Sequence, residues 1–294
     1  MVEEVRVAVV TGASSGIGLG IARALASEGW RVIGVGRDPG RCAAAEAELT
    51  AVARGDDVTI LQGDLSLMAE VSQLVEQIAA LTDRIDVLFN NAGGMVKTLE
   101  MTTEGLETCF AGNHLGPFLL TNRLLPLLRR AANARQARSV RIINTSSDGN
   151  EMIPGLNFED LQNLENFSPG AAYCSAKLAN VMFARGLALK LASDGILAFS
   201  VHPGPVASNF IAQVPDSTRQ HMETLDTISP AQGADTLVWL ATADAGELSS
   251  GGYYAERALR KPNPHAEDEA AIDRLWTQSE NLVSTTGAVL LQWN

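Results

Sequence analysis

An apolar run that ends in a glycine-rich turn constrains the fold of this chain more than any other feature. Val5 to Val10 is almost continuously apolar, as expected of a strand that is buried on both faces. The segment TGASSGIG then leads into a helical apolar pattern. Strand, glycine turn and helix in this order predict a dinucleotide site, because the helix N-terminus offers N–H donors to a pyrophosphate. The alternative is a structural turn without a ligand. The predicted binding residues are Gly12, Ser14, Ser15, Gly16, Ile17 and Gly18.

Strands and helices alternate along nearly the whole chain. Six further apolar runs predict strands at residues 31–36, 58–61, 86–89, 140–144, 196–201 and 251–255. Periodic apolar patterns predict helices at about 41–54, 67–80, 103–130, 230–241 and 266–283, with another that opens at Ser168-Pro-Gly170. No repeat or flexible linker interrupts the pattern. We therefore predict a single α/β domain over residues 1–294, a Rossmann-type doubly wound parallel sheet with helices on both faces.

Charge and composition exclude several classes of function. The net charge of −12 argues against a nucleic-acid surface and against attraction to anionic membranes. The acidic N-terminus does not resemble a signal peptide, and no apolar run approaches the roughly 20 residues that a membrane helix needs. Cys42, Cys109 and Cys174 have neither metal nor redox spacing. We therefore expect a reduced, cytoplasmic protein without a metal site.

The end of the second predicted strand bears on the choice of cofactor. The position at which NAD-preferring proteins carry a carboxylate is Gly36, and the next residue, Arg37, can pair with a 2′-phosphate. Asp38 opposes this interpretation if its side chain turns inward. At the end of the third strand, beside Leu65, Asp64 either accepts the adenine amino group or caps the following helix. We expect NADP, with NAD less favoured, and contacts from Arg37, Asp64 and Leu65.

Two further polar sites lie close to glycine in the sequence. Asn91, Ala92 and Gly93 follow the fourth predicted strand, and their small size permits close approach of backbone to a cofactor. Asn113 lies in a predicted helix just before Gly116-Pro117, where a helix is locally weakened. An Asn at such a position can bind a water or expose a carbonyl, or it can be satisfied within the core.

Tyr173 and Lys177 form the clearest catalytic pair. They are four residues apart in a predicted helix, so their side chains lie on one face. An ammonium beside a phenol favours the phenolate, so we predict that Lys177 lowers the pKa of Tyr173 and permits proton exchange near neutral pH. The alternative is a surface Tyr beside a solvated Lys, because this spacing occurs by chance in many chains.

Two long connections follow predicted strands at the ligand-binding end of the sheet. Residues 148–169 form a substrate-side insertion, and residues 205–229 form a plausible lid. Asp148 opens the insertion. Its carboxylate either reaches the mouth of the substrate site or caps a turn.

These motifs, taken in order, resemble the short-chain dehydrogenase/reductase family over nearly the whole chain. The shared motifs are Thr11-Gly-x-x-x-Gly-x-Gly18, Asn90-Asn-Ala-Gly93, Asn113, a Ser after the fifth strand, Tyr173-x-x-x-Lys177 and Pro203-Gly204. Others resemble the branch of retinol dehydrogenases and WW-domain oxidoreductases, namely Asn113-His-Leu-Gly-Pro-Phe-Leu-Leu-Thr121, Phe158-Glu-Asp-Leu161, Lys177-Leu-Ala-Asn180, His202-Pro-Gly204 and Leu275-Trp276. We do not expect the N-terminal membrane anchor that many retinol dehydrogenases carry.

The resemblance implies that Asn113, Ser147, Tyr173 and Lys177 are catalytic. In the reductive direction Tyr173 would donate a proton to the carbonyl oxygen, and Ser147 would hydrogen-bond that oxygen. Lys177 would hold the ribose hydroxyls, and Asn113 would hold a water. Spacing does not choose between Ser146 and Ser147, but the pattern of the family favours Ser147. The resemblance further implies cofactor contacts from Tyr173, Lys177, Pro203, Gly204, Val206 and Ser208.

We therefore expect an NADP-dependent carbonyl reductase or alcohol dehydrogenase that acts on a small apolar or aromatic ketone, aldehyde or alcohol. The resemblance also implies that two copies can form a homodimer. The alternative is an NADP-binding regulatory or scaffold protein with little turnover, although such a protein would not need both Tyr173 and Ser147. An epimerase or dehydratase of nucleotide sugars shares the Tyr–Lys pair but usually needs a larger C-terminal domain.

Overall fold

The computed structural model describes residues 5–55, 57–134, 138–207 and 214–293. The strands are β1 (Val7–Thr11), β2 (Arg31–Gly36), β3 (Val58–Gln62), β4 (Val87–Asn90), β5 (Arg141–Thr145), β6 (Leu197–Val201), β7 (Tyr253–Ala255) and β8 (Ala258–Leu259). The helices are α1 (Gly16–Ser27), α2 (Pro39–Val52), α3 (Met68–Leu81), α4 (Thr108–Phe110), α5 (Gly116–Ala134), α6 (Pro169–Lys190), α7 (Asp216–Met222), α8 (Pro230–Thr242) and α9 (Glu269–Thr285). Within these described ranges, none of the helices has the length and apolar character needed to span a bilayer.

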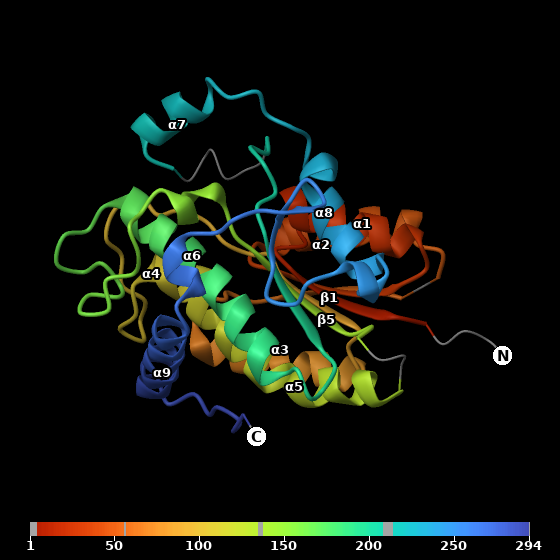
Figure 1. The fold of residues 1–294 in the computed structure, drawn as a ribbon. Coiled ribbons are helices and arrows are strands. Elements are labelled where there is room, and N and C mark those ends of the chain that lie inside the picture. Colours follow the sequence, from red (N-terminus) through yellow and green to blue (C-terminus); the bar gives the residue numbers. More distant parts are fainter. Residues whose placement is uncertain (1–4, 56, 135–137, 208–213, 294) are drawn as a thin grey trace.

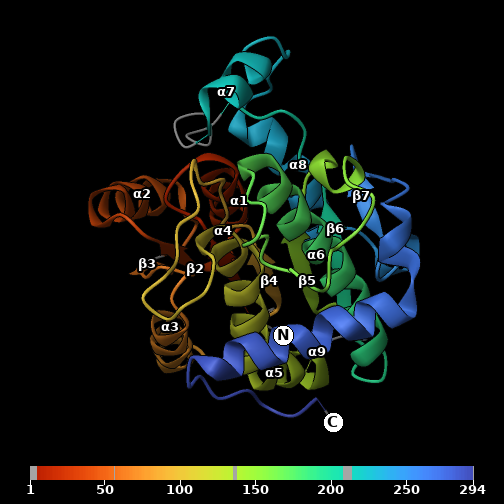
Figure 2. The same ribbon diagram turned by 90° about the vertical axis from the view of Figure 1, so that its left-hand side faces the viewer.

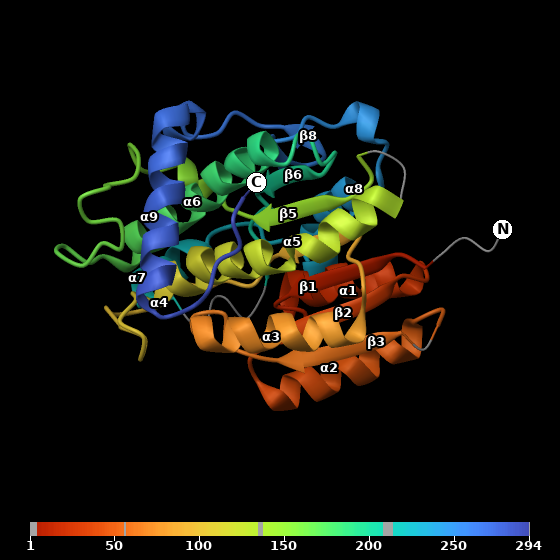
Figure 3. The same ribbon diagram turned by 90° about the horizontal axis from the view of Figure 1, so that it is seen from below.

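The strands form one sheet in the order β3-β2-β1-β4-β5-β6-β7-β8 (Figure 3). Neighbouring strands from β3 to β7 are parallel, and β8 runs antiparallel to β7. The chain winds outward from β1 to β3 and then returns to the other side of β1 with β4. This order confirms the predicted doubly wound sheet. It also creates a topological switch point between β1 and β4, where ligands bind in such sheets.

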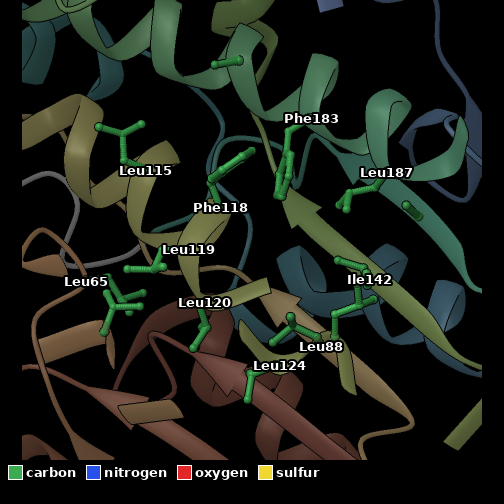
Figure 4. Packing of buried hydrophobic residues seen from close by; sticks show 14 of the residues in the cluster. Leu65, Leu88, Leu115, Phe118, Leu119, Leu120, Leu124, Ile142, Phe183 and Leu187 are labelled. Atoms are coloured by element: carbon green, nitrogen blue, oxygen red, sulfur yellow. The ribbon is translucent and has the colours of Figure 1, made fainter. Parts of the chain in front are cut away.

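Side chains along each strand alternate between two cores, one on either face of the sheet. Val9 and Ile33 pack into the core covered by α3, α5 and α6, whereas Val10 and Val32 pack beneath α1, α2 and α8 (Figure 1). Figure 4 shows the first core, in which side chains of α5 and α6 meet those of the strands. Because both faces are covered, the strands are apolar throughout, as the sequence pattern predicts.

The C-terminal helix α9, predicted at about 266–283, lies across the outer side of α5 and α6 (Figure 2). Its Trp276 is buried against Phe118 and Phe183, with ring centroids 5.1 and 5.6 Å away. The segment after α9 continues along α5, where the Asn122 side chain exchanges two hydrogen bonds with the backbone of Leu291 at 2.7 and 2.8 Å. The last described segment therefore closes one side of the molecule.

The single helix predicted over residues 103–130 is wrong in its first part. Helical structure begins only at Thr108, and a π-helix over Ala111–Leu115 separates α4 from α5. A Cβ at Gly116 would overlap the carbonyl oxygen of Leu65, so this turn is pressed closely against the loop after β3. A contact between residues so distant in sequence does not change the local pattern of apolar residues. The sequence therefore predicts one continuous helix.

The hairpin between β7 and β8 is absent from the sequence prediction. It turns at Glu256 and Arg257, whose φ angles are 51° and 59°. Two-residue turns with positive φ usually take Asn or Gly, so Glu-Arg carries no local signal. The turn is instead held from outside, because the Arg257 guanidinium forms an ion pair with Asp235 of α8, with Nε 2.7 Å from Oδ2.

Candidate active site

The glycine-rich turn between β1 and α1 lies at the switch point. Gly12 and Gly16 have φ angles of 72° and 57°, which L side chains rarely adopt. A Cβ at Gly18 would overlap the carbonyl oxygen of Gly12, so the turn folds tightly onto the helix. Ser15 precedes α1 without capping it through its side chain. The first N–H groups of α1 therefore remain for a ligand, and this cradle fits a pyrophosphate.

At the end of β2, the structure leaves no room for a side chain at Gly36. A Cβ there would lie 2.6 Å from Cys42 Sγ and 2.8 Å from Ser14 Oγ. Ser14 therefore borders the position at which NAD-preferring proteins carry their carboxylate. Asp38 turns away from this position, because it caps α2 by accepting the backbone N–H of Arg41 at 2.8 Å. The objection that Asp38 raises to the NADP interpretation is thereby removed.

Arg37 and Asp64 lie together at the carboxyl ends of β2 and β3. The Arg37 guanidinium is 3.7 Å from Asp64 Oδ2 and is largely exposed. The other oxygen of Asp64 accepts the backbone N–H and the hydroxyl of Ser66 at 2.9 and 2.8 Å. The alternative prediction that Asp64 caps the next helix is wrong, because the Glu104 carboxylate accepts the first N–H groups of α3 instead. Leu65, a predicted cofactor contact, has its side chain in the core.

The loop after β4 is tied to β1 by a threonine that the sequence does not single out. Thr11 Oγ1 accepts the backbone N–H of both Asn91 and Ala92, at 2.9 and 3.0 Å. The Asn91 side chain donates to the Thr11 carbonyl at 2.9 Å, so its amide holds the loop in place. A Cβ at Gly93 would overlap Asn113 Oδ1 and lie 3.1 Å from Lys177 Nζ. The small residue at position 93 thus lets Asn113 and Lys177 approach the backbone, while its approach to a cofactor stays a prediction.

The structure separates the two serines that follow β5. Ser146 is buried, and its hydroxyl donates to the Lys177 carbonyl at 2.7 Å. Ser147 lies on the opposite side and next to Tyr173, since a Cβ at Gly149 would lie 3.5 Å from Ser147 Oγ and 3.8 Å from Tyr173 Cε1. Neighbouring residues of a strand point to opposite faces, so only one hydroxyl reaches Tyr173. That residue is Ser147, which the family pattern favours.

Tyr173 and Lys177 lie together on α6, as their spacing predicts. Lys177 Nζ lies 5.4 Å from the centroid of the Tyr173 ring and donates to the Thr145 carbonyl at 3.3 Å. The predicted lowering of the Tyr173 pKa is wrong, because burial raises this pKa by more than the neighbouring Ser147 side chain lowers it. Burial also lowers the pKa of Lys177 to about 8. Desolvation is therefore the largest cause of the shift for both groups.

Asn113 lies in the π-helix between α4 and α5. Its amide donates to the carbonyls of Gly94 and Cys109 at 2.7 and 2.8 Å, and its Oδ1 accepts the Gly94 N–H at 3.2 Å. The side chain therefore fixes the loop after β4, and the water implied at Asn113 stays a prediction. The predicted weakness before Gly116 is confirmed as a change of helix type, a feature that recurs at functional sites.

Two further buried polar side chains, Asn180 and His114, accompany the proposed catalytic residues. The Asn180 amide donates to the same Thr145 carbonyl at 3.1 Å, and the Asn180 side chain also raises the pKa of buried His114 against the larger effect of burial. His114 Nε2 is 2.8 Å from Ser279 Oγ of α9. Asn180 has no predicted role of its own, although its spacing of three from Lys177 places both residues on one helix face.

The two long connections, residues 148–169 and 205–229, are anchored to the rest of the protein by different contacts. In the insertion 148–169, the Leu156 N–H donates to His265 Nδ1 at 2.8 Å and the Gln162 side chain accepts the N–H of Glu107 at 2.8 Å. In the lid 205–229, Val206 packs between Ile17 and Gly233 and pairs with Ile228, while α7 stands outside the helix layers (Figure 1). Pro203 and Gly204 begin this connection after β6. Ser208 lies outside the described residues.

Comparisons with known proteins agree with this fold and geometry. A family model described as short chain dehydrogenase matches residues 6–219. Human retinol dehydrogenase 12 is 35% identical over 287 residues, which cover 95% of this chain and 86% of that protein. Mouse retinol dehydrogenase 11 is 33% identical over 281 residues, covering 95% and 86%. The NADP active-site complex of Pseudomonas aeruginosa RhlG matches with a TM-score of 0.68 and 28% identity, over 85% of this chain and 94% of that chain.

A doubly wound sheet with a glycine turn at its switch point and a Ser–Tyr–Lys cluster beside it defines a nucleotide-dependent oxidoreductase. The chain belongs to the short-chain dehydrogenase family, since the family model covers well over half of its length. Within that family it resembles the retinol dehydrogenases.

Proposed function

We propose that this protein is an NADP-dependent carbonyl reductase or alcohol dehydrogenase that acts on a small apolar or aromatic ketone, aldehyde or alcohol. The observation that carries the proposal is that Ser147 and Tyr173 lie side by side, with Lys177 on the same helix as Tyr173 and the dinucleotide cradle beside them. A protein that only binds nucleotide has no need for this cluster. Ser147, Tyr173, Lys177 and Asn113 are the proposed catalytic set.

The bound nicotinamide would supply the hydride, and the side chains would manage the proton and the charge. Because burial raises the pKa of Tyr173, its phenol is protonated at neutral pH and can donate to a carbonyl oxygen. Ser147 would hydrogen-bond the same oxygen and stabilise its developing negative charge. Lys177, with a pKa of about 8, is mostly an ammonium at pH 7 and would stabilise the phenolate that remains. Asn113 would fix the loop whose Gly93 approaches Lys177.

The first test is turnover of a panel of aldehydes and ketones with NADPH, followed by the loss of nicotinamide absorbance. Tyr173→Phe should lower kcat by at least about 100-fold, because the variant keeps the ring and loses the transferable proton. Binding of NADPH to the variant, measured by fluorescence, serves as the control for folding. Tight NADPH binding by the wild type with no turnover of any carbonyl would favour the regulatory protein over the enzyme.

Three features at the end of β2 support NADP over NAD. A carboxylate at position 36 has no room, Asp38 is used in capping α2, and the largely exposed Arg37 guanidinium lies beside Asp64. An exposed guanidinium can pair with a 2′-phosphate, and Ser14 borders the same place. RhlG, a structural relative, forms an NADP complex.

Arg37→Ala should therefore weaken NADPH binding by about 10-fold or more, which corresponds to one charge-assisted hydrogen bond. NADH binding should change little, because NADH has no 2′-phosphate. Titration calorimetry with both cofactors measures the difference. Arg23→Ala, which removes an arginine paired with Glu48 on α2, provides the matched control. Equal losses for NADPH and NADH in Arg37→Ala would contradict the assignment.

A further inference from the structure

Asp148 places a carboxylate at the rim of the proposed catalytic cluster. Ser147 donates its hydroxyl proton to Asp148 Oδ1 at 3.0 Å, while Ser147 Oγ accepts the Gly149 N–H at 3.1 Å. The turn over Asp148–Glu151 is thus capped by Ser147, and the Asp148 side chain is not used for capping. More than half of that side chain, 57%, is exposed. The carboxylate therefore faces solvent while it touches the hydroxyl that would hold the substrate oxygen.

The cations near Asp148 do not neutralise it. Its nearest basic partner is His202, 3.9 Å away, whose Nδ1 accepts the Asp148 N–H at 3.0 Å. Burial lowers the pKa of His202, so the ring is neutral at pH 7. Arg260 is engaged with Glu151, with N···O distances of 2.8 Å. Lys177 is buried beneath the Tyr173 ring. A negative charge therefore remains at the rim, and it also raises the pKa of Tyr173 and of Cys174.

We propose that Asp148 selects substrates by charge, so that the site accepts neutral and cationic carbonyl compounds or alcohols and disfavours those that carry a carboxylate, sulfonate or phosphate. This inference deepens the proposed function and rests on it. An anionic group near the reacting carbon would be repelled by the Asp148 carboxylate, which touches the hydroxyl that would hold the substrate oxygen. A cationic group would instead be attracted, and by engaging Asp148 it would free the Ser147 proton for the substrate oxygen.

The test compares three para-substituted benzaldehydes of similar size: the parent compound, the 4-carboxylate and the 4-trimethylammonium derivative. The measured quantity is kcat/KM with NADPH for the wild type and for Asp148→Asn, which keeps an oxygen acceptor for Ser147 and removes the charge. For the wild type, kcat/KM should be highest for the trimethylammonium derivative, lower for the parent compound and lowest for the carboxylate. In Asp148→Asn the ratio of anion to neutral should rise by about three- to ten-fold, and the ratio of cation to neutral should fall. Added salt should shrink the wild-type discrimination, because Asp148 is exposed.

Glu165→Gln is the matched control, since it removes an exposed carboxylate from the same insertion away from Ser147. It should leave all three ratios unchanged. Ratios in Asp148→Asn that equal those of Glu165→Gln would overturn the inference while leaving the proposed reductase intact. If neither a benzaldehyde nor any other carbonyl of the panel is reduced, the proposed function fails instead. Calorimetric binding of benzyl alcohol, benzylammonium and benzoate to the cofactor-bound protein then decides the role of Asp148 without turnover. A preference against benzoate that Asp148→Asn abolishes supports the inference, and equal binding of benzoate and benzyl alcohol refutes it.

Discussion

Lys177 carries a charge that the folded chain stabilises poorly. Its side chain is 3% exposed, and burial lowers its pKa from 10.5 to about 8. Below pH 8 both the folded and the unfolded chain hold the proton, so the folded state bears the full cost of the buried charge. Between about pH 8 and 10.5 the unfolded chain binds more protons than the folded one, and stability rises with pH.

Lys177→Met should therefore stabilise the cofactor-free protein at pH 7, by about 1–3 kcal/mol of unfolding free energy. It should also remove most of the rise in stability between pH 8 and 10, while abolishing turnover. Urea unfolding at several pH values measures both effects. Lys97→Met, the same change at an exposed lysine, is the control. A pH dependence that is the same in Lys177→Met and in the wild type would show that another group is responsible.

For single residues, the sequence predicts which side chains lie close together. It predicts less well how burial changes their pKa. Ser147, Tyr173 and Lys177 come together as expected, because helix spacing and strand alternation are local rules. The direction of the Tyr173 pKa shift is wrong, because it depends on burial by distant segments. The role of Asp38 is equally open in the sequence, since capping and cofactor contact both suit an Asp at the end of a strand.

At the scale of secondary-structure elements, α9 packs against residues that lie far away in sequence. Its Trp276 is buried against α5 and α6 and stacks edge-on with Trp293 at 4.7 Å. Trp276→Ala should lower the unfolding free energy by about 3–5 kcal/mol, the usual cost of deleting a large buried side chain. Thr277→Ala, at the exposed neighbour on α9, should cost far less. Urea unfolding of both variants checks this, and similar losses in the two would mean that α9 is only loosely attached.

Elements that follow a local apolar pattern are predicted well. Elements that depend on contacts with residues distant in sequence are not. β1 to β7 and the helices α2, α3, α8 and α9 follow apolar periodicity, which is why their bounds agree with the prediction to within a few residues. The π-helix and β8 depend on contacts with Leu65 and Asp235, residues far away in sequence. The first turn of α3 is another example, because its N–H groups bind Glu104, which lies 36 residues beyond Met68.

At the scale of the whole molecule, the predicted order of layers holds because right-handed connections between parallel strands leave few alternatives. The same topology gathers the ends of β1, β2, β4 and β5 at one edge, and it thereby assembles the site from segments spread over most of the chain. The sequence cannot predict how the insertion 148–169 is held, because its anchors, His265 and Glu107, come from opposite directions along the chain.

The position of α9 has a consequence for how the protein is made. Phe118 and Phe183 are covered by a helix that begins at Glu269, so the ribosome releases the aromatic surface of α5 and α6 well before its cover exists. His114, next to Asn113, likewise gains its Ser279 partner only then. Until that moment the nascent chain presents an apolar patch of the kind that chaperones bind and that drives aggregation. Burial of this aromatic surface thus waits for the synthesis of α9, even though the residues of the proposed site are translated earlier.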